Sequence, residues 1–315
     1  MSIAIVATEF GGPEVLAAVD VDVPAPGPGQ VTVEVRAAGI NPVDYKLFSG
    51  TFGPSDATAL PLSVGREAAG VITAVGRDAT GPGGPLAVGD EVVVFPANGG
   101  YAESITVPAA AVVPKPAGLP WAEASGLLLA GATAVHAIAV LGGFGQSDTV
   151  LVHGASGSVG QLLVQLAVRE GATVIGTAAE RNHELVRGLG AIPVAYGPGL
   201  EDRVRAAASK PVTAAVDTVG TEEAIDVSLA VLADPDRLVT IASPRPGVRR
   251  IGGGPGADPG TEIRSNAWRT LLPLAAAGDL KLPVTRTYPL AEAADAVRFV
   301  KEGHAAGKVV LLPKG

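Results

Sequence analysis

Cysteine is absent from the 315-residue chain. The protein therefore has no disulfide, no cysteine nucleophile, no iron–sulfur cluster and no cysteine-ligated zinc. The four histidines, His136, His153, His183 and His304, are scattered along the sequence. An isolated histidine on a helix or strand is more often a surface or hydrogen-bonded core residue than a metal ligand. We expect no metal site.

Aromatic residues are also scarce, at 4% of the chain, although 47% of its residues are hydrophobic. The cores must therefore be built from valine, leucine, isoleucine and alanine. Basic residues are outnumbered, with 23 lysines and arginines against 31 aspartates and glutamates, and the net charge is −8. Because a negative protein repels nucleic acids and anionic lipids, we expect neither as a partner. The length suits about two domains.

Long hydrophobic runs are few. Residues 1–10 lack a basic stretch ahead of their apolar run and include Glu9, so they predict a first β-strand rather than a secretion signal, and hence a cytoplasmic protein. Residues 126–145 are apolar over nearly the length of a membrane span. They contain polar residues and glycines and lack aromatic or basic flanks, which favours a buried helix ending near residues 142–143.

The first third of the chain is predicted to be β-rich. Valine-rich runs at residues 31–36, 71–75 and 91–95 are separated by glycine and proline turns, a spacing that is typical of a small barrel or sandwich. Past residue 260, helical patterns at 268–277 and 291–301 precede a closing strand at Lys308–Leu312.

From residue 116 strands alternate with helices. Short apolar runs occur at Thr149–His153, 173–176, 213–216 and 237–242, and a helical pattern covers 159–170. Strand–helix–strand alternation predicts a parallel sheet covered by helices on both faces, a doubly wound α/β fold.

A glycine-rich turn follows the strand Thr149–His153. A tight turn is needed at Ala155, close approach of the backbone to a pyrophosphate at Gly157, and close helix-to-sheet packing at Gly160. A purely structural turn also prefers glycine, but the strand before and the helix and strand after favour dinucleotide binding. The predicted cofactor-binding residues of the turn are Ala155, Ser156, Gly157, Ser158, Val159 and Gly160.

The end of the next strand, around Thr177, carries no acid where an NAD-binding protein normally has one. Arg181 and Asn182 follow, and a guanidinium can grip a 2′-phosphate with two hydrogen bonds, so we predict NADP. Glu180 remains open as a displaced ribose ligand. Arg181 also has a plain alternative as a solvated residue at a helix start.

The turn and four further motifs closely resemble the medium-chain dehydrogenase/reductase superfamily over nearly the whole chain. These motifs are GREAAGVITAVG at 65–76, VGDEV at 88–92, GGYAE at 99–103 and GKVVL at 307–311. Within the superfamily, NPVD at 41–44 and ERNH at 180–183 resemble the zinc-free, NADPH-dependent quinone oxidoreductases.

The resemblance implies a GroES-like catalytic domain interrupted by a Rossmann domain. We expect residues 1–115 and 262–315 to form the GroES-like domain and residues 116–261 the NADP-binding Rossmann domain. The resemblance also implies a homodimer.

The resemblance further places the catalytic zinc ligands of the metal-bearing relatives at Asn41, Arg66 and Leu129, which are not a zinc ligand set. Without a Lewis acid to stabilise an alkoxide, ordinary alcohol oxidation is disfavoured. The expected reaction is hydride transfer to a carbon that is already electrophilic, in a quinone or an α,β-unsaturated carbonyl.

The catalytic candidates lie together at Asn41, Asp44, Tyr45 and Lys46, where they offer hydrogen-bond donors and a proton source. Several similar quinone reductases carry tyrosines at the places of Lys46 and Phe52, so proton donation by a tyrosine does not transfer directly to this chain. Lys46 or solvent is the alternative donor. Asp44 serves equally well as the N-cap of a short helix.

Other candidates for cofactor contact are spread along the chain. Thr133 resembles a family residue near the nicotinamide ribose, or it bonds back to its own helix. Tyr196, Val219 and Lys308 are also predicted to bind the cofactor, Val219 because it follows a strand at the ligand-binding edge of the sheet. Glu67 either orients Arg66 or forms a surface ion pair.

Three functions remain open from the sequence. The leading prediction is an NADPH-dependent quinone or enone reductase acting on a small molecule. The alternatives are a biosynthetic reductase of enoyl or polyketide-type thioesters, and a non-catalytic NADPH-binding regulatory protein.

Overall fold

The computed structural model describes residues 1–52, 57–253, 256–303 and 305–314, so His304 lies outside the described residues. The chain divides into two compact units: unit 1 is Met1–Leu129 with Trp268–Gly315, and unit 2 is Ala130–Ala267. The first division falls inside helix α2 (Trp121–Val140) and not at the composition change near residue 116. A continuous apolar helix carries no linker signal, so composition and compactness divide the chain at different residues.

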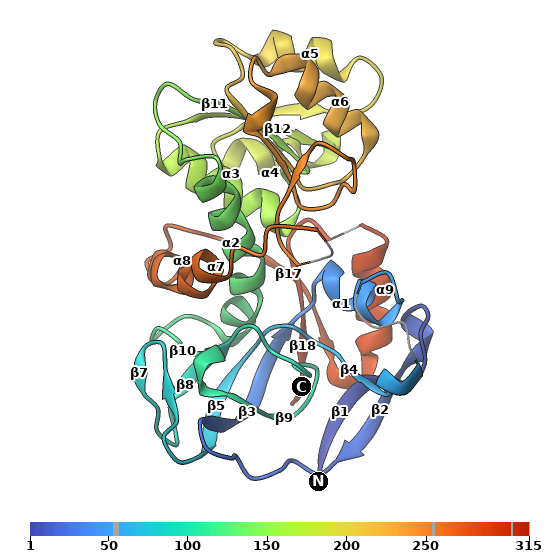
Figure 1. Ribbon diagram of the computed structural model, residues 1–315, viewed down its shortest axis with the longest axis vertical. Coiled ribbons are helices and arrows are strands. Elements are labelled where there is room, and N and C mark those ends of the chain that lie inside the picture. Colours follow the sequence, from blue (N-terminus) through green and yellow to red (C-terminus); the bar gives the residue numbers. More distant parts are fainter. Residues whose placement is uncertain (53–56, 254–255, 304, 315) are drawn as a thin grey trace. The chain divides into compact units, whose positions relative to one another are not determined.

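Unit 1 is built on a seven-stranded sheet (Figure 1). Six strands follow the order β10-β8-β5-β3-β18-β17, and β9 also pairs with β3. Strand β18 comes from the end of the chain, yet it pairs antiparallel with β3, with Val310 opposite Gly39. The strands are β3 (Gln30–Gly39), β5 (Ala68–Val75), β8 (Glu91–Val94), β9 (Ser104–Pro108), β10 (Val112–Pro114), β17 (Val284–Pro289) and β18 (Lys308–Leu312).

Smaller elements complete unit 1. A second sheet has the order β2-β1-β4, and β6 pairs with β7. These strands are β1 (Ser2–Ala7), β2 (Leu16–Val21), β4 (Leu62–Ser63), β6 (Thr80–Gly81) and β7 (Gly84–Pro85). The helices are η1 (Pro13–Val15), α1 (Pro42–Phe48), η2 (Ala57–Ala59), η3 (Ala109–Ala111), α8 (Trp268–Ala276), η6 (Leu290–Glu292) and α9 (Ala293–Lys301).

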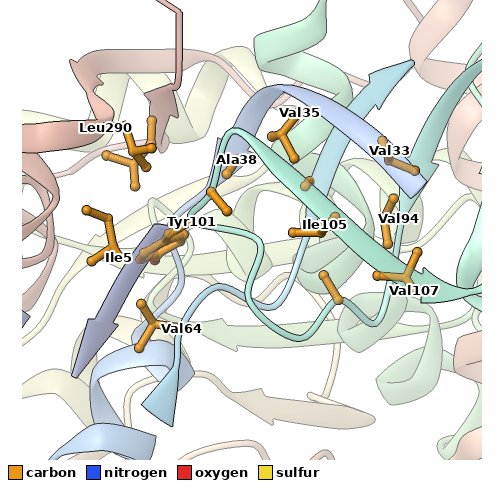
Figure 2. Packing of buried hydrophobic residues seen from close by; sticks show 14 of the residues in the cluster. Ile5, Val33, Val35, Ala38, Val64, Val94, Tyr101, Ile105, Val107 and Leu290 are labelled. Carbon is orange, nitrogen blue, oxygen red and sulfur yellow. The ribbon is translucent and has the colours of Figure 1, made fainter. Parts of the chain in front are cut away.

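The core of unit 1 is mostly aliphatic, as the shortage of aromatic residues predicts, although it also buries Phe48, Tyr101 and Tyr288. Figure 2 shows Val33, Val35, Val94, Ile105 and Val107 packed between the strands. These side chains are at most 7% exposed. Their alternation with more exposed residues along β3 and β9 reflects the two-residue period of a strand with one face in the core.

Unit 2 is a six-stranded parallel sheet with the order β13-β12-β11-β14-β15-β16. This order reverses between β11 and β14, as in a doubly wound dinucleotide-binding fold, so the predicted fold class is confirmed. Figure 1 shows α3 and α4 on one side of the sheet and α5 and α6 on the other. The strands are β11 (Thr149–His153), β12 (Thr173–Ala178), β13 (Ile192–Ala195), β14 (Ala214–Asp217), β15 (Leu238–Thr240) and β16 (Arg249–Arg250). The helices are α3 (Ser158–Arg169), η4 (Glu180–Asn182), α4 (His183–Gly188), α5 (Leu200–Ala207), α6 (Glu222–Val231), η5 (Pro235–Arg237) and α7 (Thr261–Asn266).

Helix α2 is the apolar segment that suits a membrane span by length and composition. Within the described residues it is the one helix that passes this test, and 72% of its most apolar window is buried inside the fold. It ends at Val140, ahead of Gly142 and Gly143, whose φ angles of 83° and 80° favour glycine. Its burial is what the sequence predicts for a core helix.

Candidate functional site

The glycine-rich turn of unit 2 joins β11 to α3. Gly154 has a φ of 74°, and a Cβ on Gly160 would lie 2.2 Å from the carbonyl oxygen of Gly154. Gly157 is the N-cap of α3, and no side chain caps this helix. The first N–H groups of α3 and its positive dipole end are therefore arranged to receive an anionic group.

A buried chain of hydrogen bonds supports this turn from below. The N–H of Gly154 donates to Thr177 Oγ1, which lies 3.3 Å from His153 Nδ1. His153 Nε2 lies 3.0 Å from Ser228 Oγ, and the Ser228 hydroxyl donates to the Ala224 carbonyl at 2.7 Å. This direction of donation requires a proton on Nε2 of His153. Burial lowers the pKa of His153 to about 4, which agrees with a neutral ring.

The end of β12 is brought against the turn. Asn182 Nδ2 donates to Ser156 Oγ at 3.2 Å, so a residue of η4 and a residue of the glycine-rich turn lie side by side. Arg181, in the same short helix, is exposed and makes no hydrogen bond or ion pair with the described residues. Glu180 is exposed as well. Asn182 therefore contacts the turn, and Arg181, the other predicted 2′-phosphate ligand, precedes it directly in sequence.

The neighbouring strands end at the same carboxyl edge. Asp217, fully buried at the end of β14, accepts hydrogen bonds from the N–H groups of Val219 and Gly220 and from Thr240 Oγ1. These bonds shape the turn that carries Val219, which is 49% exposed, and Tyr196 beyond β13 is 57% exposed. Both residues follow strands at the carboxyl edge of the sheet, where ligands bind in such folds.

Thr133 is engaged by a residue that sequence reasoning missed. Arg264 of α7 donates from Nη1 to Thr133 Oγ1 at 2.8 Å, and burial lowers the pKa of this guanidinium. Its position in a glycine-rich part of the sequence gave no sign of burial. The nearest feature of the sequence is Gly260, four residues earlier. Its φ is 51°, and it packs closely against the ring of His136.

In unit 1, Asn41 lies within a buried polar network. Its Oδ1 accepts a hydrogen bond from Lys308 Nζ at 2.7 Å, and its Nδ2 donates to Glu67 Oε1 at 2.9 Å. Lys308 Nζ also contacts Glu67 Oε1 at 2.6 Å, and Glu67 Oε2 accepts the N–H of Leu129. Glu67 therefore neither orients Arg66 nor forms a surface ion pair, because its carboxylate is turned into the fold. The structure also places Lys308 beside Asn41, away from the exposed surface of unit 1.

Asp44 is not the N-cap of α1. Asn41 takes that position, and Asp44, three residues later, accepts the Asn41 backbone N–H at Oδ2. The same oxygen accepts the Tyr101 hydroxyl at 2.7 Å, while Oδ1 is buried without a hydrogen-bond partner. Desolvation raises the pKa of Asp44 to about 6, although its hydrogen bonds to Tyr101 and Asn41 act in the opposite direction.

The other two catalytic candidates lie on the following turn of α1. Tyr45 packs against the core of unit 1 and is partly buried, which raises its pKa. The Lys46 ammonium lies 5.2 Å from the centre of the Phe52 ring. Lys46 and Phe52 thus contact one another.

No group of three or more histidine, aspartate or glutamate side chains is arranged to hold a metal ion in the described ranges. Asn41 and the backbone of Leu129, two of the places where the resemblance to the superfamily predicts zinc ligands in metal-bearing relatives, are both hydrogen-bonded to Glu67.

Comparison with known proteins identifies related families at both ends of the chain. Residues 27–117 match the alcohol dehydrogenase GroES-like domain, and residues 189–311 match a family described as zinc-binding dehydrogenase.

Three relatives illustrate the similarity. A quinone oxidoreductase of Rattus norvegicus is 39% identical over 191 residues, which cover 60% of this chain and 56% of that protein. A phthioceranic/hydroxyphthioceranic acid synthase of Mycobacterium tuberculosis is 32% identical over 302 residues, 90% of this chain but 14% of the synthase. A mycobacterial protein solved in complex with NADPH is 31% identical, with a TM-score of 0.85 over 99% of this chain and 100% of its own.

Proposed function

Because this chain belongs to the quinone oxidoreductase-like branch of the medium-chain dehydrogenase/reductase superfamily, we propose that it is an NADPH-dependent oxidoreductase that reduces a quinone or an α,β-unsaturated carbonyl without a metal ion. The observation that carries this proposal is the carboxyl edge of the unit 2 sheet. There a glycine-rich turn meets Asn182 and the exposed Arg181, and no carboxylate ends β12.

The residues at this edge fit the cofactor. The uncapped N-terminus of α3 suits the pyrophosphate, and a Cβ on Gly160 would fill the close contact with Gly154 that the turn requires. Arg181 and Asn182 would hold the 2′-phosphate, and Tyr196 and Val219 offer apolar faces to the flat rings. When bound, NADPH supplies the hydride.

The side chains of unit 1 favour a hydride acceptor that is already electrophilic. The side chain of Asn41 and the backbone of Leu129 stand where zinc-bearing relatives have ligands, and neither is a usual zinc ligand. An acceptor that spreads negative charge by conjugation needs less stabilisation from hydrogen bonds than a ketone does. Burial raises the pKa of Tyr45, which keeps the proton on its hydroxyl, and Lys46 is a second group able to supply a proton.

A second candidate function is reduction of an enoyl thioester. It is favoured by the similarity to a mycobacterial acid synthase over 90% of this chain. A third candidate function is NADPH binding without turnover. It remains open because Lys46 and Phe52 stand where the resemblance predicts tyrosines. We propose that the protein acts as a homodimer in the cytoplasm. We also propose that neither nucleic acid nor membrane is a partner, because the net charge of −8 repels both.

The test is NADPH consumption by the purified protein against quinones, enones, enoyl thioesters and saturated ketones, repeated with NADH. We expect turnover with quinones or enones, little with saturated ketones, and a preference for NADPH. Efficient reduction of simple ketones would refute the proposed chemistry. Turnover with thioesters alone would select the second candidate, and NADPH binding without any turnover would select the third.

A further inference from the structure

Unit 1 buries an ion pair that the proposed function does not use. Lys308 Nζ lies 2.6 Å from Glu67 Oε1, and the two side chains are 2% and 0% exposed. Burying two charges is costly unless further hydrogen bonds satisfy their remaining atoms. Here the second oxygen of Glu67 accepts the N–H of Leu129 at 2.9 Å. The fold therefore maintains this pair with specific contacts.

The pair determines the orientation of the Asn41 amide. An ammonium only donates hydrogen bonds and a carboxylate only accepts them, so Asn41 must present its oxygen to Lys308 and its nitrogen to Glu67. A flipped amide would place like groups against each other. A neutral pair of neighbours would not make this distinction.

The side chain of Lys308 passes close to the backbone at two glycines. A Cβ on Gly126 of α2 would lie 2.5 Å from Lys308 Cγ, and a Cβ on Gly39 of β3 would lie 2.8 Å from Lys308 Cε. Glycine inside a helix weakens it relative to alanine. Gly126 thus leaves room for the lysine stem. Gly39 leaves room for the lysine and for the backbone of α2, since a Cβ there would also lie 2.6 Å from the Ser125 carbonyl oxygen.

We propose that Lys308 and Glu67 are positioning residues for the reduction. They fix the Asn41 amide and, because Asn41 is the N-cap of α1, the start of the helix that carries Tyr45 and Lys46. This inference rests on the proposed function. It assigns the pair an effect on turnover, not on cofactor affinity. The residues proposed to hold the phosphates and the flat rings lie in unit 2, and Lys308, which the sequence also suggested as a cofactor contact, is buried against Asn41 and Glu67.

The experiment compares Glu67→Gln, Lys308→Met and the double variant with wild type. The matched control is Lys115→Met, which removes another lysine of unit 1 that is buried and ion-paired, to Glu91 at 2.9 Å. We measure kcat, the KM for NADPH and the melting temperature. Each single variant should lower kcat by about tenfold or more with the KM changed less than about twofold, whereas the control should lower only the melting temperature.

The double variant tests whether the two residues act together. It restores electroneutrality, so its loss of kcat should be smaller than the product of the two single losses. If Lys308→Met does not fold, the isosteric Glu67→Gln carries the test. Wild-type kcat in Glu67→Gln, with melting lowered as in the control, would assign the pair to stability alone and overturn the inference. Absence of NADPH turnover by wild type with every acceptor would instead refute the proposed function, and this inference with it.

Discussion

The carboxyl group of Asp44 should make the stability of unit 1 depend on pH in a distinctive direction. Asp44 is 1% exposed, and one of its oxygens is buried without a hydrogen-bond partner. Desolvation raises its pKa from 3.8 to about 6, against the pull of Tyr101, the Asn41 N–H and Lys308, while Glu67 adds to the rise. The folded protein therefore binds this proton more tightly than the unfolded chain does.

The size of the effect follows from the shift. About two pKa units correspond to about 3 kcal/mol of unfolding free energy. This stability is present at low pH, is lost as pH rises from about 4 to about 6, and stays lost above that range. Asp44→Asn mimics the protonated form, because the amide oxygen can still accept the Tyr101 and Asn41 hydrogen bonds that converge on Oδ2.

The assay is urea unfolding followed by tryptophan fluorescence. The chain has two tryptophans, and both Trp121 and Trp268 belong to unit 1, the unit that contains Asp44. The free energy of Asp44→Asn minus that of wild type should rise by about 3 kcal/mol between about pH 4 and about pH 7.5. The control Asp22→Asn alters an exposed aspartate of the same unit, and its difference should not grow. A constant difference for Asp44→Asn would refute the reasoning that burial raises the pKa of this carboxyl.

Four further outcomes are expected. Arg181→Ala should weaken NADPH binding by about tenfold or more while sparing NADH, as followed by cofactor fluorescence, because a charge-assisted contact contributes about 1.5–3 kcal/mol; equal losses would place the specificity elsewhere. Asn41→Ala should lower kcat more than it weakens NADPH binding, and unchanged kcat with reduced melting temperature would make Asn41 purely structural. Unit 2 should lose about 3 kcal/mol as pH falls from about 6.5 to about 4, since burial lowers the pKa of His153 to about 4, and hydrogen exchange of β11 should report the loss. Chelators should change neither activity nor melting temperature, and loss of activity together with bound zinc would contradict this.

Local patterns in the sequence predicted much of the fold. The runs that indicated strands at 149–153 and 173–176 became β11 and β12, and the turn between β11 and α3 lies where glycine spacing placed it. These features depend on residues close in sequence, because a buried parallel strand is a short apolar run and a sharp turn needs glycine. Asn182 and Ser156 are farther apart in sequence, but the strand-helix-strand unit brings the two turns that carry them together.

Polar contacts between residues distant in sequence could not be predicted from local patterns. Asp44 was expected as a possible N-cap, yet the cap is Asn41, because the helix begins at Pro42 and Asp44 is its third residue. Asp44 instead accepts the hydroxyl of Tyr101, which is distant in sequence. The partner of Thr133, Arg264, is equally distant in sequence. A single sequence states which groups can donate or accept, but only the tertiary fold selects their partners.

Lys308 shows where a usable signal did exist. A lysine at the start of a strand normally indicates a solvent-exposed end, and Glu67 beside an alanine-rich strand was assigned to a surface pair or to Arg66. The unusual feature is glycine at Gly39, inside the sheet, and at Gly126, inside an apolar helix, where each costs stability relative to alanine. Such glycines require something that passes close to the backbone. At Gly126 it is the stem of a buried lysine, and at Gly39 it is that stem together with the Ser125 carbonyl. The charge of the lysine needs a buried carboxylate, and the two together determine the orientation of Asn41.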